Sequence, residues 1–442
     1  MTERVVGNLF QWFLERSGAY GERQFAYGKG TSVHDALLLS VLSWLLLMEH
    51  GFLVGVYCSD VSGAFDRVCA KRMTKKLAAM HLHPKIHGLL ASWLEPRVSK
   101  VAVGKKFSRN TPLTNSVFQG TVWGPPLWNC YYADASTAVA KNDFMDIVFA
   151  DDLNCTKAFP SSMANSEILD DIKDCQAEVH KWGEANRVAF DPSKESFHVL
   201  HRSRGSGENF KILGVSFDKA LVMHDACREL AVAAGWRLKT LLRCRKYHTK
   251  AEMFRLYKAQ ILSFIESRTA GIHFAAASNL SCIDRIQRRF LSEMNVSEAD
   301  ALIAWNLAPL ECRRHIAMLG FLYRVAWGIA PDNLCELFKW KAPAGITGYL
   351  RGLSSRHAWQ FEEPINSMGS RHTDAVARSA FGSTIVWNKL PVEIVSCPSI
   401  KLFQRSLQRA VIERSKVSTE FANFFDNAKR MTVPEFQRYF ET

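Results

Sequence analysis

The sequence predicts an α+β protein in which strands are confined to the first half and helices occur throughout. Up to about residue 220, short apolar runs rich in β-favouring residues alternate with segments of helical periodicity. Beyond that point the apolar spacing is almost entirely helical. Of the 442 residues, 48% are hydrophobic and 22% are charged, a composition that allows a real core and suggests two or three domains.

The chain is strongly basic. Its 56 Lys and Arg residues against 43 Asp and Glu residues leave a formal charge of +13. A surplus of this size favours a polyanionic partner, which is either nucleic acid or an acidic membrane face. Charge alone does not choose between these two.

Cysteine usage and the N-terminus indicate an intracellular protein. The 11 cysteines include no C-x-x-C pair, so neither a zinc ribbon nor a dense disulfide framework is expected, and free thiols in a reducing compartment are the simpler interpretation. The first residues lack the apolar stretch of a secretory signal. The most apolar run, 36–48, is shorter than the ~20 residues of a membrane span, so we expect a buried helix there and no membrane partner.

Four segments of the first 120 residues have clear preferences. Residues 35–50 are apolar on all sides of a helix, which predicts burial against several neighbours. Residues 52–60 form a short apolar run that ends on an aspartate and predicts a buried strand. Residues 70–94 have helical spacing with a break at Pro84. Residues 99–120 alternate and turn like a hairpin.

The next hundred residues continue the mixture. Residues 145–159 predict a second hairpin with two adjacent aspartates at its turn. Residues 166–188 predict an amphipathic helix, and strands are expected at 196–200 and within 210–217.

The remaining chain is predicted to be helical. Residues 228–267 carry apolar stripes and a basic cluster at 237–250. A loop zone rich in Pro and Gly is expected near 342–372. We find no internal repeats, no low-complexity tract and no sustained heptads.

Three carboxylates could form a metal site. Asp60 ends the 52–60 strand, and Asp151 and Asp152 form the turn of the 145–159 hairpin. Taken separately, Asp60 could be a strand-end cap and the acidic pair a solvated turn. Two strand ends that bring these carboxylates together could instead hold two hard cations such as Mg²⁺, which prefer oxygen ligands and keep water for a phosphate-bearing substrate.

A glycine- and proline-containing segment lies between the two acidic strands. Residues 119–134, "QGTVWGPPLWNCYYAD", make a tight turn before a helix. At such a turn the backbone can approach a nucleotide closely. Without other context, the Gln-Gly pair that opens the segment is simply a turn.

These segments resemble a known family. "DVSGAFD", then "QGTVWGPPLWNCYYAD", then "FADD" are similar to motifs A, B and C of reverse transcriptases, and the F-A-D-D form is typical of non-LTR, LINE-like retrotransposons. Three further blocks resemble motif D, the primer-grip motif E and a fingers block: 182–200, 210–218 and 22–38. The C-terminal region resembles the tail of LINE-like polyproteins through "IDRIQRRFL", "LAPLECRRHIAMLGFLYRV" and "FGSTIVWNKLPVEIV".

The resemblance implies a right-hand polymerase with a palm of βαββαβ type whose antiparallel sheet is covered by helices. It places partial fingers at 1–51, the palm with remaining fingers elements at 52–220, a helical thumb at 221–300 and a helical C-terminal extension at 301–442. The implied reaction adds dNTPs to the 3′-hydroxyl of a DNA primer on an RNA template, with two Mg²⁺ ions or Mn²⁺. The implied location is the nucleus or cytoplasm, where retroelements work. Protein partners are not indicated.

The family motifs assign the catalytic residues. Asp60 and Asp151 match the aspartates that bind both metal ions, and Asp152 is the supporting carboxylate. Phe65 matches the aromatic steric gate that excludes a 2′-hydroxyl; a core phenylalanine is the alternative. Asp66 is expected to be structural.

Further residues match the nucleotide pocket. Gln119 and Gly120 would lie beside the incoming nucleotide and template. Lys194 matches the motif D lysine, a candidate proton donor to pyrophosphate, although a solvated loop lysine is the alternative. Lys29 would supply a cation to the triphosphate where the family often has arginine at neighbouring positions.

The primer and the duplex would be held by later segments. Leu213 and Gly214 match the primer grip. Thumb residues facing duplex phosphates are expected in the basic cluster, unless this is an ordinary solvated helix face: Arg237, Lys239, Arg243, Arg245 and Lys246.

Two other interpretations remain open. The upstream fingers block and an endonuclease domain of the family are not visible, so we expect an N-terminally truncated copy, which could be a catalytically inactive remnant that only binds nucleic acid. The second alternative is an RNA-dependent RNA polymerase. Such enzymes usually have a polar residue at the Phe65 position and Gly at the Ala150 position, so the sequence favours the reverse transcriptase.

Overall fold

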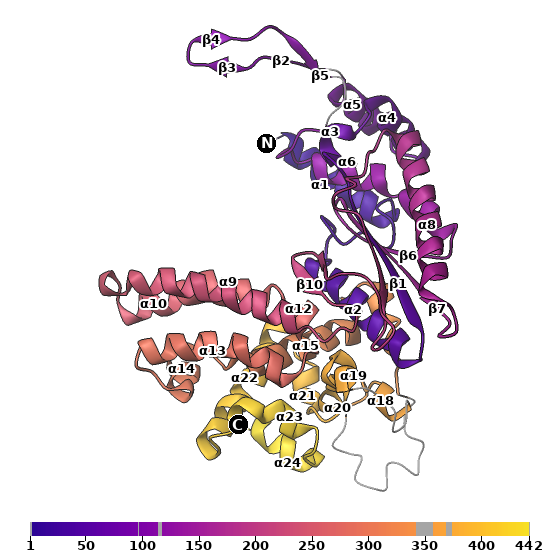
Figure 1. Cartoon of the computed structure of the whole chain (residues 1–442). Helices are drawn as coiled ribbons and strands as arrows, with labels where there is room; N and C mark the ends of the chain where they lie inside the picture. The colour runs from indigo at the N-terminus through magenta and orange to yellow at the C-terminus, as the bar shows by residue number, and fades with distance from the viewer. Residues whose placement is uncertain (1, 96, 114–116, 342–356, 368–373, 442) are drawn as a thin grey trace. The chain divides into compact units, whose positions relative to one another are not determined.

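The chain forms two compact units in a computed structural model that describes residues 2–95, 97–113, 117–341, 357–367 and 374–441. Unit 1 comprises Met1–Ala36 and Gly51–Glu208, and unit 2 comprises Leu37–His50 and Asn209–Thr442. The predicted α+β class is confirmed, since an antiparallel sheet occurs together with many helices (Figure 1). Among the described residues, no helix is long and apolar enough to cross a membrane.

Unit 1 contains the main sheet and a separate set of short strands. Its elements are α1 (Thr2–Arg16), β1 (Leu53–Asp60), α3 (Ala64–Arg67), α4 (Ala70–Ala79), α5 (Pro84–Trp93), β2 (Arg97–Ser99), β3 (Ala102–Val103), β4 (Lys106–Phe107), β5 (Thr111–Leu113), α6 (Gly124–Tyr132), α7 (Ala135–Ala140), β6 (Met145–Phe149), β7 (Asp152–Phe159), α8 (Asn165–Asn186) and β8 (Ser196–Leu200). The predicted strands at 52–60 and 196–200, the two hairpins as far as they are described, and the helices at 70–94 and 166–188 are confirmed. The 70–94 segment is two helices, and the second begins at Pro84.

The main sheet has four strands in the order β6-β7-β1-β8, and every neighbouring pair is antiparallel. Strand β1 is central and buried from Leu53 to Ser59. Its register with β7 runs from Leu53 opposite Phe159 to Asp60 opposite Asp152. The carboxylate-bearing ends of the two strands therefore meet at one end of the sheet.

Helix α8 packs against the face of β1 at a glycine. A Cβ atom on Gly55 would lie 2.7 Å from the Phe159 ring, closer than real Cβ contacts, and 3.1 Å from Cδ1 of Ile172, which is a tight contact. Ile168 and Ile172 on α8 are fully buried. Glycine at this position thus allows the apolar stripe of α8 to cover the strand closely.

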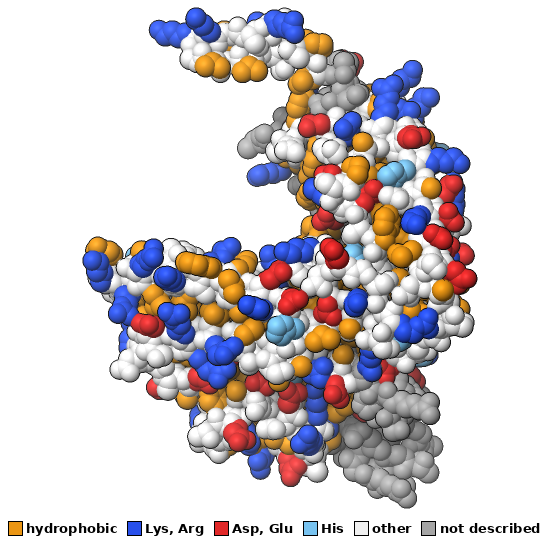
Figure 2. Space-filling model, viewed as in Figure 1, with side chains coloured by type: hydrophobic (Ala, Val, Ile, Leu, Met, Phe, Trp, Pro, Cys, Tyr) orange, Lys and Arg blue, Asp and Glu red, His pale blue; other side chains and the backbone are white. Residues whose placement is uncertain are grey.

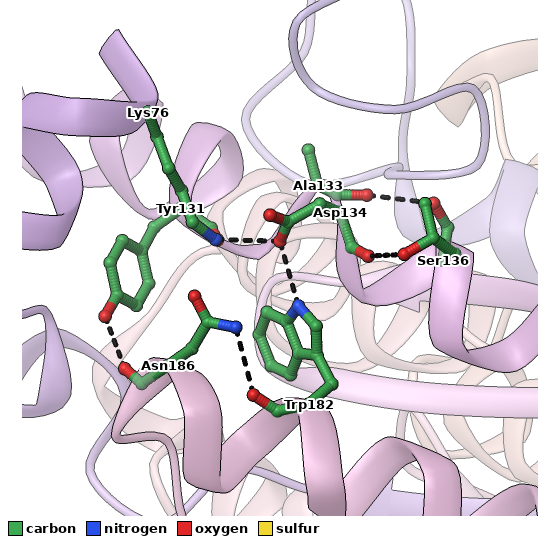
Figure 3. Close-up of polar contacts among 8 residues, drawn as sticks. Lys76, Tyr131, Ala133, Asp134, Ser136, Trp182 and Asn186 are labelled. Atoms are coloured by element: carbon green, nitrogen blue, oxygen red, sulfur yellow. Dashed lines mark hydrogen bonds and ion pairs between the residues drawn. The ribbon is translucent and has the colours of Figure 1, made fainter. Parts of the chain in front are cut away.

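A polar network joins α4, the α6–α7 junction and α8 (Figure 3). Lys76 donates to the backbone oxygen of Tyr131 at 2.6 Å and to Oδ1 of Asp134 at 2.7 Å, and Trp182 Nε1 donates to the same Asp134 oxygen at 3.0 Å. The Lys76 ammonium also lies 4.6 Å from the Tyr131 ring and 5.3 Å from the Trp182 ring. Burial lowers the pKa of Lys76. The network holds the helices beside the sheet in one arrangement.

The predicted hairpin at 99–120 is a long arm as far as it is described. Arg97 to Ser99 pair with Thr111 to Leu113, and Ala102 and Val103 pair with Phe107 and Lys106 around a turn that begins at Gly104, whose φ is 60°. The four strands are drawn as one long hairpin in Figure 1.

Unit 2 is mainly helical. Its elements are most of α2 (Val33–Glu49), β9 (Phe210–Ile212), β10 (Val215–Phe217), α9 (His224–Arg243), η1 (Arg245–Tyr247), α10 (Lys250–Tyr257), the π-helix η2 (Lys258–Leu262), α11 (Ser263–Glu266), α12 (Thr269–Ile272), α13 (Ala277–Glu293), α14 (Glu298–Trp305), α15 (Leu310–Ala326), α16 (Asp332–Cys335), α18 (Pro364–Ser367), α19 (Asp374–Arg378), α20 (Ala380–Trp387), α21 (Val392–Val395), α22 (Ile400–Val417), η5 (Phe421–Asn423), α23 (Phe424–Ala428), α24 (Val433–Gln437) and η6 (Arg438–Phe440). The predicted helical character beyond residue 220 is confirmed. Most of the predicted loop zone at 342–372 lies outside the described residues.

Aromatic pairs form the core of unit 2. On α2, which is the predicted buried helix, the Trp44 ring lies 5.3 Å from that of Phe217 and 6.1 Å from that of Phe210 in edge arrangements. Tyr257 and Phe290 stack at 4.2 Å between α10 and α13. Such pairs stabilise packing beyond the area they bury, so α2 and the β9–β10 hairpin are held as one structure.

Candidate active site

Three carboxylates gather where β1 ends and β7 begins. Asp60 is the last residue of β1 and lies opposite Asp152, the first residue of β7. Asp151 precedes Asp152 in the turn between β6 and β7. The structure therefore brings together the three aspartates that the sequence analysis singled out. The Asp60 side chain is only 14% exposed.

The turn that carries Asp151 depends on an unusual backbone conformation at Ala150. Its φ is 59°, in the left-handed region that residues with a Cβ atom seldom adopt. Gln24 brackets this residue, because its Oε1 accepts from the Ala150 N–H at 2.9 Å and its Nε2 donates to the Ala150 oxygen at 3.3 Å. Trp128 Nε1 donates to the same oxygen at 2.8 Å. These three hydrogen bonds compensate the strain and aim Asp151.

Gln24 reaches the turn because its own segment pairs with β6. The Phe25 N–H donates to the Val148 oxygen at 2.9 Å, and the Val148 N–H donates to the Arg23 oxygen at 3.0 Å. Neither Gln24 nor Trp128 is predicted as a site residue from the sequence. Gln24 lies in the fingers-like block 22–38 and Trp128 in the block 119–134, and both blocks are recognised in the sequence. Neither block, however, indicates a hydrogen bond to the Ala150 turn.

The carboxylates repel one another. Burial, together with repulsion from Asp60 and Asp151, raises the pKa of the Asp152 carboxyl from 3.8 to about 6, against the opposing effect of Lys194. Burial and Asp60 also raise the pKa of Asp151. Three carboxylates this close together carry more negative charge than the single Lys194 ammonium offsets, and such a group fits a divalent cation with oxygen ligands.

The burial of Asp152 and its repulsion by neighbouring carboxylates predict that Asp152→Asn stabilises unit 1 above neutral pH. The folded chain binds more protons than the unfolded chain between pH 3.8 and about 6, so the contribution of Asp152 to stability falls as pH rises through that range. The pKa shift of Asp152 corresponds to about 3 kcal/mol, and solvent access to the carboxyl reduces this amount. We therefore expect Asp152→Asn to raise the free energy of unfolding by about 1–2 kcal/mol at pH 8.

The measurement is urea unfolding at pH 5 and pH 8 with EDTA present, followed by hydrogen exchange in the 145–159 hairpin. The advantage of the variant should grow with pH. Adding Mg²⁺ should then stabilise the natural chain more than the variant. A variant that is less stable than the natural chain at pH 8 would show that Asp152 is not strained by its neighbours.

Lys194 lies beside the carboxylates in a short loop. Its ammonium forms an ion pair with Oδ2 of Asp60, and this hydrogen bond raises the pKa of Lys194. The loop returns to β1 where the Asp191 N–H donates to the Asp60 backbone oxygen at 3.0 Å. The Ser193 hydroxyl donates to Asp191 Oδ1 at 2.7 Å and closes the turn. The predicted lysine is thus part of the acidic cluster.

A buried carboxylate next to Lys194 anchors that loop. The Glu195 side chain is only 6% exposed, and its Oε1 accepts from the Tyr57 hydroxyl and lies 2.8 Å from His180 Nε2. Gln176 Nε2 donates to the other oxygen at 2.9 Å. The sequence analysis missed Glu195, because an acidic residue beside a loop lysine ordinarily indicates a solvated position. The Ser59 hydroxyl also donates to Oε1 at 3.4 Å, so the partners of Glu195 lie on two other elements, β1 and α8.

Phe65 lies on the short helix α3 that follows Asp60. Its ring is half-buried, with its centroid 6.2 Å from that of Trp128. The Phe65 backbone oxygen accepts from the Val117 N–H at 2.9 Å, which joins α3 to the segment before α6. Asp66 is exposed.

The three remaining predicted residues of the nucleotide pocket are exposed. Gln119 and Gly120 lie in the turn before α6, where Gly120 has a φ of 83°. Thr121 stabilises this turn, since its hydroxyl donates to the Phe118 oxygen at 2.7 Å and accepts from the Gly124 N–H at 3.2 Å. Lys29 is exposed after the segment that pairs with β6.

The predicted primer-grip residues form the β9–β10 turn in unit 2. Leu213 and Gly214 have φ values of 49° and 78°, the pair of positive values that a tight hairpin turn requires. Arg268 Nε donates to the Gly214 oxygen at 3.2 Å and supports the turn from α12's N-terminus.

The predicted basic residues of unit 2 lie on an exposed surface with aromatic rings. The Arg237 guanidinium lies 3.9 Å above the Phe264 ring, Lys239 lies 5.0 Å from Trp236, and Lys246 lies 4.9 Å from Tyr247. Arg245 pairs with Glu293, and Arg243 is exposed. Figure 2 shows Lys and Arg side chains over α9 and α10. Such cation–aromatic surfaces are compatible with nucleic acid and with an ordinary solvated helix face.

Clustered carboxylates at the ends of antiparallel strands, next to a lysine, are compatible with a site that holds cations for the transfer of phosphate-bearing groups. Residues 2–217, just under half of the chain, match the family described as reverse transcriptase (RNA-dependent DNA polymerase), and this part of the chain belongs to that family. The family predicted from motifs A, B and C is therefore confirmed.

The chain is similar to the RNA-directed DNA polymerase from the mobile element jockey of Drosophila melanogaster. The two are 24% identical over an alignment of 323 residues that covers 66% of this chain and 34% of that protein. The chain thus spans about a third of the length of this relative.

Two solved structures are similar at a distance. Telomerase from Candida albicans, in complex with a fragment of telomeric RNA, has a TM-score of 0.39 and 13% identity, covering 68% of this chain and 56% of the other. Apo telomerase from Candida tropicalis has a TM-score of 0.39 and 12% identity, and the match covers 76% of this chain and 55% of the telomerase chain.

Proposed function

We propose that the chain is an RNA-directed DNA polymerase of a non-LTR, LINE-like retrotransposon. The observation that carries the proposal is the meeting of Asp60, Asp151 and Asp152 at one end of the sheet of a reverse transcriptase family member. The similarity to the jockey polymerase supports the retrotransposon class. The substrates are dNTPs, an RNA template and a DNA primer with a free 3′-hydroxyl. The reaction takes place in the nucleus or cytoplasm.

In this proposal Asp60, Asp151 and Asp152 hold two Mg²⁺ ions, or Mn²⁺. The raised pKa of Asp152 and the close approach of the strand ends fit such a group. When bound, the ions supply activation of the primer hydroxyl and stabilisation of the charge on the leaving pyrophosphate. The chain itself contributes the placement of the carboxylates, through the Ala150 turn and the hydrogen bonds of Gln24 and Trp128.

Lys194 serves as the general acid. Its ammonium carries the proton that the departing pyrophosphate takes up, and Asp191 and Glu195 keep its loop beside the carboxylates. Phe65 lies under the sugar and excludes a 2′-hydroxyl, while Gln119 and Gly120 contact the nucleotide and template. Lys29 contributes a cation to the triphosphate.

The remaining assignments follow the family order. Residues 1–51 form partial fingers, 52–220 the palm, 221–300 the thumb and 301–442 a C-terminal extension. Leu213 and Gly214 hold the primer end. The basic residues of the thumb contact duplex phosphates through Arg237, Lys239, Arg243, Arg245 and Lys246.

The steric-gate assignment predicts that Phe65→Ala relaxes the choice of sugar. Removal of the ring gives space to a 2′-hydroxyl, so incorporation of ribonucleotides relative to deoxynucleotides should rise by about 10- to 100-fold. The measurement is primer extension on an RNA template with single dNTPs and single rNTPs, and kcat/KM is compared for each.

Phe65→Tyr, which keeps the ring, is the matched control and should retain the preference for dNTPs. An unchanged ratio in Phe65→Ala would refute the gate. A natural chain that prefers rNTPs would instead support an RNA polymerase.

A further inference from the structure

The arm at residues 97–113 extends into solvent over most of its length. Every residue from Lys100 to Pro112 is exposed to solvent. We call residues 97–113 the basic arm, and its strands β2 to β5 are seen in Figure 1. None of the proposed catalytic or nucleotide-binding residues lies on it.

The basic arm carries positive charge without any compensating acid. Arg97 lies at its base, and four further cations lie along it: Lys100, Lys105, Lys106 and Arg109. The sequence contains no acidic residue between Glu95 and Asp134. Figure 2 shows the basic side chains together with hydrophobic ones on this hairpin. This charge complements the phosphates of a nucleic acid strand.

Large apolar side chains lie open to solvent among these charges. The exposed fractions are 63% for Val98, 66% for Val101, 74% for Val103 and 70% for Phe107. Phe107 is paired with Ala102, a small residue that leaves the aromatic ring uncovered on its face of the ribbon. An exposed ring surrounded by cations is the arrangement on which an unpaired base stacks.

The base of the arm is tied to the proposed nucleotide pocket. The Arg97 guanidinium lies 4.6 Å from the Phe118 ring and 5.0 Å from the Trp93 ring, and it donates to the Trp93 oxygen at 2.9 Å. Phe118 precedes Gln119, and its other neighbour Val117 donates to the Phe65 backbone at 2.9 Å. A strand lying along the arm therefore leads toward the residues proposed to contact the nucleotide and template.

We propose that the basic arm binds single-stranded nucleic acid, namely the unpaired part of the template. Its four cations hold successive phosphates, and Phe107 stacks on a base. A single strand fits better than a duplex because its bases are free to stack on the ring. This inference rests on the proposed polymerase function for the identity of the strand, but the binding itself is independent of catalysis.

The test measures binding by fluorescence anisotropy of a labelled single strand of RNA, using the full chain with Asp151→Asn so that no extension occurs. One variant replaces Lys100, Lys105, Lys106 and Arg109 by alanine. The matched control removes the same charge from exposed lysines elsewhere in unit 1, with alanine at Lys71, Lys75, Lys85 and Lys181.

The arm variant should bind at least about tenfold more weakly, and its plot of log affinity against log salt should be less steep by about 3. The control should change little. Phe107→Ala alone should weaken binding by about tenfold, while Phe107→Trp should restore it.

Several outcomes would overturn the proposal. Equal losses of RNA affinity in the arm variant and the control would show that binding depends on the overall positive charge of the chain and not on the arm. A loss confined to duplex would show that the arm recognises paired strands, and a loss confined to phosphatidylserine vesicles would show that it contacts an acidic membrane. Failure of the polymerase proposal is distinguishable. If the arm binds RNA but the natural chain, with Asp151 intact, never extends a primer, the arm is established and the polymerase function is refuted.

Discussion

Replacing Asp151 by asparagine is expected to abolish nucleotide addition, with a loss of at least about 10³-fold in rate. Asp151 projects from the strained Ala150 turn next to Asp60 and Asp152, and its carboxylate is proposed to ligate both metal ions. Asparagine has nearly the same shape but no negative charge, so the fold should persist. The measurement is primer extension on an RNA template with Mg²⁺ or Mn²⁺ and dNTPs.

The control for this substitution is Asp66→Asn. Asp66 is also an aspartate of the "DVSGAFD" segment, but it is exposed and is assigned no catalytic role. It should retain extension within about threefold, as expected for a surface substitution worth less than 0.5 kcal/mol. Equal activity in Asp151→Asn and the natural chain would refute the metal-site assignment. If the natural chain binds template–primer but never extends it, the alternative of an inactive nucleic-acid-binding remnant is the correct one.

Trp128→Ala is expected to lower the unfolding free energy of unit 1 by about 4 kcal/mol. The indole is fully buried, stacks on the Tyr132 ring at a centroid distance of 5.2 Å and donates to the Ala150 oxygen at 2.8 Å. Truncation leaves a cavity in the core and removes a buried hydrogen bond at the turn that carries Asp151. Urea unfolding should report the loss, and hydrogen exchange should localise it to 145–159.

Trp128→Phe separates packing from the hydrogen bond. It keeps most of the ring volume but loses the N–H group, so we expect a cost of about 1–2 kcal/mol and a decrease in extension rate of about tenfold. Trp12→Ala is the control for the loss of an indole as such, because Trp12 is 57% exposed, and it should cost less than about 1 kcal/mol. If Trp128→Phe leaves both stability and extension unchanged, Gln24 alone suffices to hold the turn.

The positions of the strands and of the carboxylates could be predicted because their signals are local. The apolar run 52–60 and the hairpin 145–159 follow from period-two patterning and turn chemistry, which act between neighbouring residues. Asp60 stood out because it ends one strand, and Asp151 and Asp152 stood out because they occupy a turn. The resemblance of several blocks in order then assigned these residues to one family.

Other parts of the site were not predictable because they depend on contacts between distant segments. Gln24 and Trp128 support the Ala150 turn from two different elements, and no local pattern marks a side chain as the partner of a particular backbone group. Glu195 is buried where side chains of β1 and α8 converge on it, among them Tyr57, Gln176 and His180. The local sequence around Glu195 predicts a solvent-exposed side chain.

The sequence by itself determined the class of the protein, the identity of the acidic residues and the helical character of the second half. These properties depend on residue type and spacing along the chain. Only the tertiary structure decided that Asp60 faces Asp152 across two strands and that Lys194 pairs with Asp60, and only it showed that the arm at 97–113 projects its cations into solvent. Register and exposure are set by which distant surfaces pack together, because hydrogen bonds and burial act in space and not along the sequence.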